Sequence, residues 1–146
     1  MTEIDVHFNA PDKVHHACRL LRKAVVAAGA KVAVAGDRAT LDSLDASLWQ
    51  FSATDFIAHC RGDADAEVLA RSPVVLLDGP SQGAPSHRQV LVNLGCELPT
   101  GFERFERLID VVGTDEAERQ SGRQRWRHYA ERGYAITRHD IGGGGR

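Results

Sequence analysis

The N-terminal third of the chain alternates between two apolar periods, and this alternation is the strongest constraint on the fold. Segments with an apolar side chain at every second position are typical of half-buried strands. Segments with the i, i+3, i+4, i+7 spacing are typical of amphipathic helices. They follow one another as a strand at Glu3 to Phe8, a helix at Lys13 to Ala28, a strand at Lys31 to Ala35, and a helix with Leu41, Leu44 and Leu48 on one side. This order predicts parallel strands joined by right-handed crossovers.

The rest of the chain continues the pattern with shorter segments. Thr114-Asp115-Glu116 predicts the start of a last helix, with a capping hydroxyl and two carboxylates at the positive end of the helix dipole. This helix should run to Arg132 and stop at Gly133, and Gly101 to Phe105 should form a brief helical turn. The expected strands are Phe56 to His59, Val74 to Leu77, Gln89 to Leu94, Glu106 to Val112 and an edge strand from Tyr134 to His139. The sum is a three-layer α/β domain with a mostly parallel central sheet flanked by helices.

Length and composition predict a single-domain, intracellular protein. A chain of 146 residues corresponds to one domain, expected over residues 1–141, with a flexible Gly-rich tail over residues 142–146. No apolar run approaches the roughly 18 residues of a membrane span, and the N-terminus lacks a secretory pattern, so we expect a cytoplasmic protein without membrane contact. Cys18, Cys60 and Cys96 are too few and too dispersed for a disulfide framework, and we expect reduced, buried thiols.

The glycines argue against a dinucleotide site. The first expected strand ends in Asn9-Ala10-Pro11-Asp12, with neither the GxGxxG nor the GxxxxGK[ST] motif whose backbone N–H groups cradle phosphate. Gly36 is a single glycine at a turn, where glycine is common for conformational reasons. A small nucleotide-binding domain or enzyme therefore stays an alternative that rests on the fold class alone.

No group of residues in the sequence has the types and spacing expected of a catalytic site. His15 and Cys18 lie one helical turn apart, but two ligands do not close a metal site. We expect Cys18 on the core side of its helix and both His15 and His16 partly exposed. Cys60 follows His59 directly, and in a strand the two side chains would point in opposite directions. We therefore expect no catalytic residue, no metal and no cofactor.

The charge of the chain is distributed unevenly. The formal net charge is −2, which argues against generic polyanion binding, yet the segment from Arg119 to Arg132 holds five arginines against one acidic residue. Arg123 lies four residues after Arg119, and Trp126 and Arg127 lie three and four residues after Arg123, so these four residues share one helix face. A solvated basic face accounts for most such runs, but a large aromatic ring among guanidinium groups is typical of a recognition surface. The composition favours binding of a local anionic partner.

Four segments, in order along nearly the whole chain, together point to a known family. They are VHFN...DKVHHACRLLRKAVVAAGAKVAV from Val6 to Val34, LDASLWQFSATDFIAH from Leu44 to His59, HRQVLVNLG from His87 to Gly95, and FERFERLIDVV...RQRWRHYAERGYAI from Phe102 to Ile136. These segments resemble the chi subunit of the bacterial DNA polymerase III holoenzyme. No single motif carries the resemblance, and residues 61–82 match least.

The resemblance implies a non-enzymatic accessory subunit of the clamp-loader complex in DNA replication. Its family members have a Rossmann-like α/β fold, pair with the small psi subunit, and bind the acidic C-terminal tail of single-stranded-DNA-binding protein. That tail ends with aspartates and an apolar phenylalanine carboxylate. Contact with DNA itself would be indirect or weak. An acidic peptide needs arginines, and a terminal carboxylate needs a paired donor, so the basic aromatic helix fits this ligand.

The resemblance also implies which residues bind that tail. The residues that match the family's binding positions are Arg119, Arg123, Trp126 and Arg127 on the last helix, Val112 just before it, and the aromatic pair Trp49 and Phe56 after the second helix. This chain departs from the family pattern at Ser121 and Gly122, where the family helix often has apolar residues or alanine. Gly122 should lower helix stability by up to about 1 kcal/mol relative to alanine.

Overall fold

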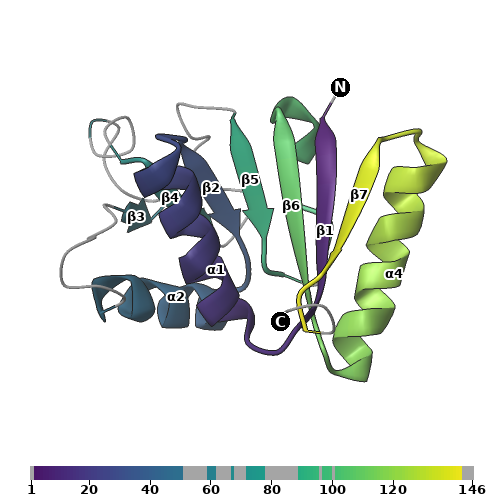
Figure 1. Ribbon diagram of the computed structural model, residues 1–146, viewed down its shortest axis with the longest axis horizontal. Coiled ribbons are helices and arrows are strands. Elements are labelled where there is room, and N and C mark those ends of the chain that lie inside the picture. Colours follow the sequence, from purple (N-terminus) through teal and green to yellow (C-terminus); the bar gives the residue numbers. More distant parts are fainter. Residues whose placement is uncertain are drawn as a thin grey trace.

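The part of the chain that the structure describes forms seven strands and three α-helices (Figure 1). The computed structural model describes residues 2–50, 59–61, 67, 72–77, 89–95, 97–99 and 101–142. The strands are β1 (Glu3–Ala10), β2 (Val32–Ala35), β3 (His59–Arg61), β4 (Val74–Leu77), β5 (Val90–Asn93), β6 (Arg107–Gly113) and β7 (Ile136–Asp140). The helices are α1 (Lys13–Leu21), continued by a π-helical segment (Arg22–Ala27), α2 (Arg38–Gln50), a 3₁₀ turn (Phe102–Arg104) and α4 (Glu116–Glu131).

All seven strands form one parallel sheet. Their order is β3-β4-β2-β5-β6-β1-β7, so β3 and β7 are the two edges and β1 lies between β6 and β7. Val6 of β1 lies beside Asp110 of β6 and Arg138 of β7. The parallel α/β architecture predicted from the sequence is confirmed, and the described sheet is entirely parallel rather than mostly so.

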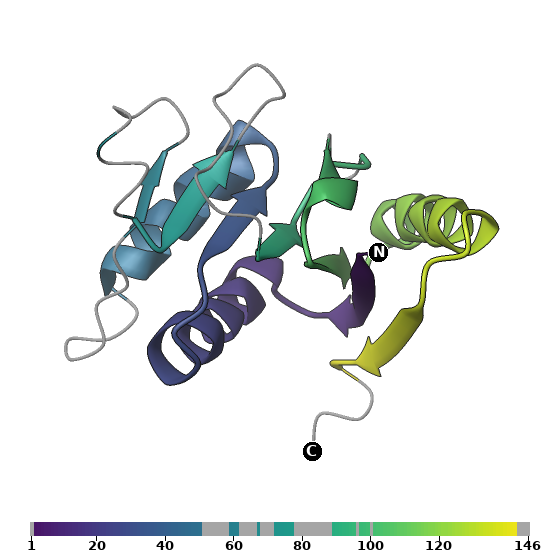
Figure 2. The same ribbon diagram turned by 90° about the horizontal axis from the view of Figure 1, so that it is seen from above.

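Helices cover both faces of the sheet, with a separate apolar core on each. Leucines of α1 and α2 pack together against β2, β4 and β5 on one face. Tyr129 of α4 and Phe102 of the 3₁₀ turn pack on the other face against Ile4 and Val6 of β1. Figure 2 shows α1 and α4 on opposite sides of the sheet. Because side chains alternate along a strand, Asp5 and His7 of β1 face the α1 side while Val6 faces α4.

Short side chains fix where the helices begin. The carboxylate of Asp12 accepts a hydrogen bond from the His15 backbone N–H at 3.0 Å, and that of Asp115 accepts one from the Glu118 N–H at 2.8 Å. The predicted start of the last helix is confirmed, but the cap is the Asp115 carboxylate rather than the Thr114 hydroxyl, because Asp115 is the extended residue directly before the first turn. 

The other local predictions are confirmed in most of the described chain. Gly133, with φ of 80°, follows the last helix as expected, and Gly29, with φ of 67°, follows the predicted helix from Lys13 to Ala28. Cys18 is buried on the core side of α1. The strand expected over Phe56 to His59 is observed at His59–Arg61, and residues 56–58, like Cys96, lie outside the described residues. No described helix is both long and apolar enough to cross a membrane.

Three histidines meet on the α1 side of β1. His7 Nδ1 lies 2.9 Å from Nε2 of His16 on α1, and the rings of His7 and His139 on β7 are 4.7 Å apart between centroids. Asp5 accepts a hydrogen bond from His139 at 3.2 Å. Burial, and then the nearby His16 and His139, lower the pKa of His7 from 6.5 to about 4. The folded chain therefore holds His7 neutral where the unfolded chain would protonate it.

This shift predicts a loss of stability in acid. Between pH 6.5 and 4 the unfolded chain binds more protons than the folded chain, so the free energy of unfolding should fall as the pH falls through this window. We expect His7 to account for about 1 to 2 kcal/mol of that loss, because its ring is only partly buried. Urea unfolding of the wild type and of His7→Gln at pH 7.5, 6 and 5 measures it.

The substitution His15→Gln at an exposed position of α1 is the matched control and should keep the wild-type pH profile. If His7→Gln loses as much stability in acid as the wild type does, the histidine contact is not the cause.

Candidate functional site

A buried ion pair attaches α4 to the sheet. Arg125 donates two hydrogen bonds to the Asp110 carboxylate, from Nε at 2.8 Å and Nη2 at 3.0 Å, and the Tyr129 hydroxyl donates a third at 2.8 Å. All three residues are at most 2% exposed. Burial opposes the charge of Arg125, but the bound carboxylate outweighs it and raises the Arg125 pKa. Burial, together with the Asp110 charge, also raises the pKa of Tyr129. Both donors therefore keep their protons.

The ion pair changes how the arginine-rich segment is understood. The sequence places five arginines between residues 119 and 132, but Arg125 points into the core and its charge is neutralised by Asp110. Arg119, Arg123 and Arg127 remain exposed on α4. The basic surface is therefore smaller and more directional than the composition alone indicates.

Gly122 allows α4 to lie close to β6. A Cβ atom at this position would lie 2.9 and 3.0 Å from the two methyl groups of Val112, closer than side chains tolerate. Val112 is β-branched, so its methyl groups have little freedom to move away. The glycine that lowers helix propensity is thus required by the close approach of the helix to the sheet.

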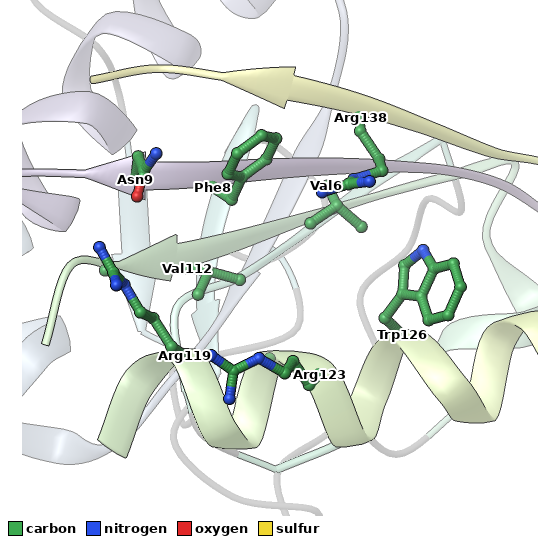
Figure 3. Close-up of a pocket in the computed structure, with 10 residues that line it drawn as sticks. Val6, Phe8, Asn9, Val112, Arg119, Arg123, Trp126 and Arg138 are labelled. Carbon is green, nitrogen blue, oxygen red and sulfur yellow. The ribbon is translucent and has the colours of Figure 1, made fainter. Parts of the chain in front are cut away.

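A cavity of about 520 Å³ opens beside this contact, between α4 and the strands β1 and β6. This volume is within the range of roughly 300 to 1,000 Å³ that is usual for ligand pockets. Val6, Phe8 and Val112 line it from the strands, and Arg119, Arg123 and Trp126 line it from α4 (Figure 3). Arg138 of β7 also lines it, together with Asn9, Gly113 and Gly122.

The cavity combines apolar walls with positive charge. Among the described residues, one weak ion pair involves the three arginines of the cavity: Arg123 Nη1 lies 3.8 Å from Glu116 Oε1, and both side chains are more than half exposed. Glu118, at the start of α4, is bound to Lys13 at 3.0 Å and to the Gly113 N–H at 3.1 Å. Trp126 is 41% exposed, which is high for an indole. The site therefore has the composition of a recognition pocket for an anion with an apolar part.

The structure brings together four of the seven residues that the sequence assigned to this site. Val112, Arg119, Arg123 and Trp126 line the cavity. Arg127 is exposed on α4 but does not line it.

Of the two aromatic residues assigned after the second helix, the structure describes only Trp49, and Trp49 does not line the cavity. Trp49 lies at the end of α2, where its ring is 5.5 Å from that of His59 on the edge strand β3. This is the opposite edge of the sheet from β7. Phe56 lies outside the described residues.

Sequence reasoning missed the cavity residues of β1 and β7. The alternation of apolar residues predicts that Val6 and Phe8 lie on the buried face of a strand. It does not predict that these side chains also line a cavity. Arg138 lies in a strand of mixed composition, and its position beside Val6 follows from pairing between segments more than 130 residues apart. No local signal in the sequence would have identified these residues.

The described residues contain no group of three or more histidine, cysteine, aspartate or glutamate side chains placed to hold a metal ion. Burial raises the pKa of the Cys18 thiol to about 11, so it is a poor nucleophile near neutral pH. The chemistry available at the cavity is binding through arginine and aromatic side chains.

Comparison with known proteins gives the family. A family model described as DNA polymerase III chi subunit, HolC, matches residues 1–137. The chain belongs to the DNA polymerase III chi subunit family. It is 33% identical over 145 residues to DNA polymerase III subunit chi of Pseudomonas aeruginosa, an alignment that covers 97% of this chain and 98% of that protein. It is also 24% identical over 99 residues to subunit chi of Haemophilus influenzae, covering 68% of this chain and 67% of that protein.

Family membership confirms the coarse function implied by the resemblance. The chain is a chi subunit of DNA polymerase III, an accessory and non-catalytic part of that polymerase, and it acts in DNA replication. The three-layer parallel α/β fold agrees with the Rossmann-like fold expected for this family.

The buried ion pair predicts a large loss of stability when one partner is removed. Arg125→Met should lower the free energy of unfolding by about 3 to 5 kcal/mol, because it leaves the Asp110 carboxylate buried without its counter-ion. Arg127→Met, an exposed position on the same helix, should change it by less than about 0.5 kcal/mol. Chemical denaturation of both variants measures the difference, and similar values for the two would mean that the ion pair does not hold α4.

Gly122→Ala tests the close approach of α4. The gain in helix propensity, up to about 1 kcal/mol, should be outweighed by overpacking against Val112, which typically costs about 1 to 3 kcal/mol. We expect a net loss of stability by thermal denaturation, whereas the exposed Gln124→Ala should be neutral or slightly stabilising. A more stable Gly122→Ala protein would show that the contact relaxes freely.

Proposed function

We propose that this chi subunit is an adaptor that binds the acidic C-terminal tail of single-stranded-DNA-binding protein and connects it, through the psi subunit, to the clamp loader. The observation that carries this proposal is the cavity itself, in which three guanidinium groups surround an apolar floor. An acidic peptide that ends in a phenylalanine carboxylate offers the complementary groups: carboxylates for the arginines and a ring for the floor.

The positions of the residues support a role for each. Arg123 lies one turn from Arg119 along α4 and borders the cavity between Arg119 and Trp126, so it is the best-placed donor for the terminal carboxylate. Arg119 would attract the aspartates that precede the terminal residue. Val112 and Trp126 would contact the terminal phenylalanine, and the resemblance adds Phe56 as a predicted contributor.

An adaptor needs a second surface for its other partner. Trp49 is 64% exposed at the opposite edge of the sheet from the cavity. Large exposed aromatic side chains are enriched at protein interfaces. We therefore assign Trp49 to contact with psi rather than to the peptide cavity. In this arrangement the subunit works in the cytoplasm, and its contact with DNA is indirect or weak.

Arg123→Ala should weaken binding of an acidic, phenylalanine-terminated peptide by roughly 1.5 to 3 kcal/mol, the range for hydrogen bonds to charged groups. The domain should stay folded, since Arg123 is largely exposed. Isothermal titration calorimetry with such a peptide measures the loss. Arg22→Ala removes an exposed arginine of the π-helical segment that continues α1, at the other face of the sheet. This variant is the matched control and should bind as the wild type does.

Two further measurements complete this test. Binding should weaken as salt rises, because exposed arginine–carboxylate attraction is screened over about 8 Å at physiological ionic strength. If Arg123→Ala and Arg22→Ala bind the peptide equally well, or if the salt profile is flat, the arginines are not the contact. A thermal-shift screen distinguishes the alternative function: stabilisation by mononucleotides instead of the peptide would favour a nucleotide-binding domain.

A further inference from the structure

Arg138 differs from the other two arginines of the cavity in where it comes from and what it touches. It belongs to the edge strand β7, whereas Arg119 and Arg123 belong to α4. Its register partner on β1 is Val6, so its side chain leaves the sheet on the α4 side. Figure 3 shows Arg138 and Trp126 approaching the same end of the cavity from opposite walls.

The guanidinium of Arg138 lies over an aromatic ring. Its Cζ atom is 5.0 Å from the centroid of Phe8, within the distance of a cation–π contact. No ion pair joins Arg138 to an acidic side chain in the part of the chain that the structure describes. The acidic residue two positions along β7, Asp140, instead accepts a hydrogen bond from Asn9 at 3.2 Å.

A planar guanidinium can contact an aromatic ring on each of its two faces. Phe8 and Arg138 both line the cavity, so a ligand ring bound there can contact the Arg138 guanidinium in addition to Phe8. An aliphatic side chain of equal size would fill the same volume, but it has no π-electrons to attract the cation. A cation–π contact of this kind distinguishes aromatic from aliphatic ligands, which apolar walls alone do not.

We propose that Arg138 is a specificity-determining residue that selects an aromatic side chain at the end of the bound peptide, by stacking its guanidinium on that ring. This inference rests on the proposed function of the cavity. In this arrangement the three arginines have different roles. Arg119 and Arg123 on α4 attract the carboxylates of the peptide, and Arg138 on β7 recognises its aromatic ring.

The test compares two acidic peptides that differ in one ring. One ends in phenylalanine and the other in cyclohexylalanine, which has a similar size and no aromatic face. For the wild type, calorimetry should give about five- to tenfold tighter binding of the phenylalanine peptide. Arg138→Met, which keeps an unbranched aliphatic stem but removes the guanidinium, should bind both peptides about equally.

Two more variants keep the result interpretable. Arg22→Met removes an exposed arginine at the other face of the sheet, and it should retain the wild-type preference for phenylalanine. Arg138→Lys keeps the charge but lacks the planar group, and it should show a smaller preference than the wild type.

The inference is overturned if the preference for phenylalanine is the same in the wild type and Arg138→Met. A second result also overturns it. If Arg138→Met weakens the binding of both peptides equally, and has no such effect on peptides with an amidated C-terminus, Arg138 binds the terminal carboxylate rather than the ring. If the wild type binds neither peptide, the proposed function fails and this inference with it. Failure of the inference alone leaves peptide binding intact, so the two results are distinguishable.

Discussion

The buried carboxylate of Asp110 determines how the last helix meets the sheet. It lies on β6 with almost no contact with solvent, and it accepts hydrogen bonds from Arg125 and Tyr129. Because those two residues are four positions apart, they fix one face of α4 toward the sheet. The rotation of the helix, and hence the direction of every other side chain on it, follows from this contact. A hydrophobic contact of similar area would leave more freedom of rotation, since it has no directional hydrogen bonds.

The short distance between α4 and the sheet depends on a second feature, the absence of a side chain at Gly122. Three residues before Arg125, this glycine lies directly against Val112, so the backbone of α4 comes close to β6 at that point. The cavity borders the same contact, with Arg119 and Arg123 on either side of the glycine in sequence. One feature that costs helix propensity therefore also brings two arginines close to the apolar floor. This explains why the position tolerates a residue that an isolated helix would disfavour.

The sequence predicted the fold well because the spacing of apolar residues along short segments indicates which segments are strands and which are helices. Alternation in β1 and the leucine spacing of α2 both reflect which side chains reach the core, and both were confirmed. The site was predicted less completely, because charge composition does not distinguish a buried arginine from an exposed one. Arg125 lies among the surface arginines in sequence, and its partner Asp110 is fifteen residues away on another element. The assignment of Trp49 came from the family resemblance, and its position at the opposite edge of the sheet follows from topology that no local pattern contains.

The position of β7 shows why a cavity of this kind requires the whole sheet. After α4 the chain crosses back and adds β7 beside β1, its first strand, so that Arg138 reaches the level of Val6. Without β7, the strand side of the cavity would be apolar near Trp126, and positive charge would come from the helix alone. The last strand thus adds a cation on the wall facing α4, and charge then borders the apolar floor from both sides. A ligand that enters must satisfy both walls at once, which favours one that carries negative charge and an aromatic ring close together.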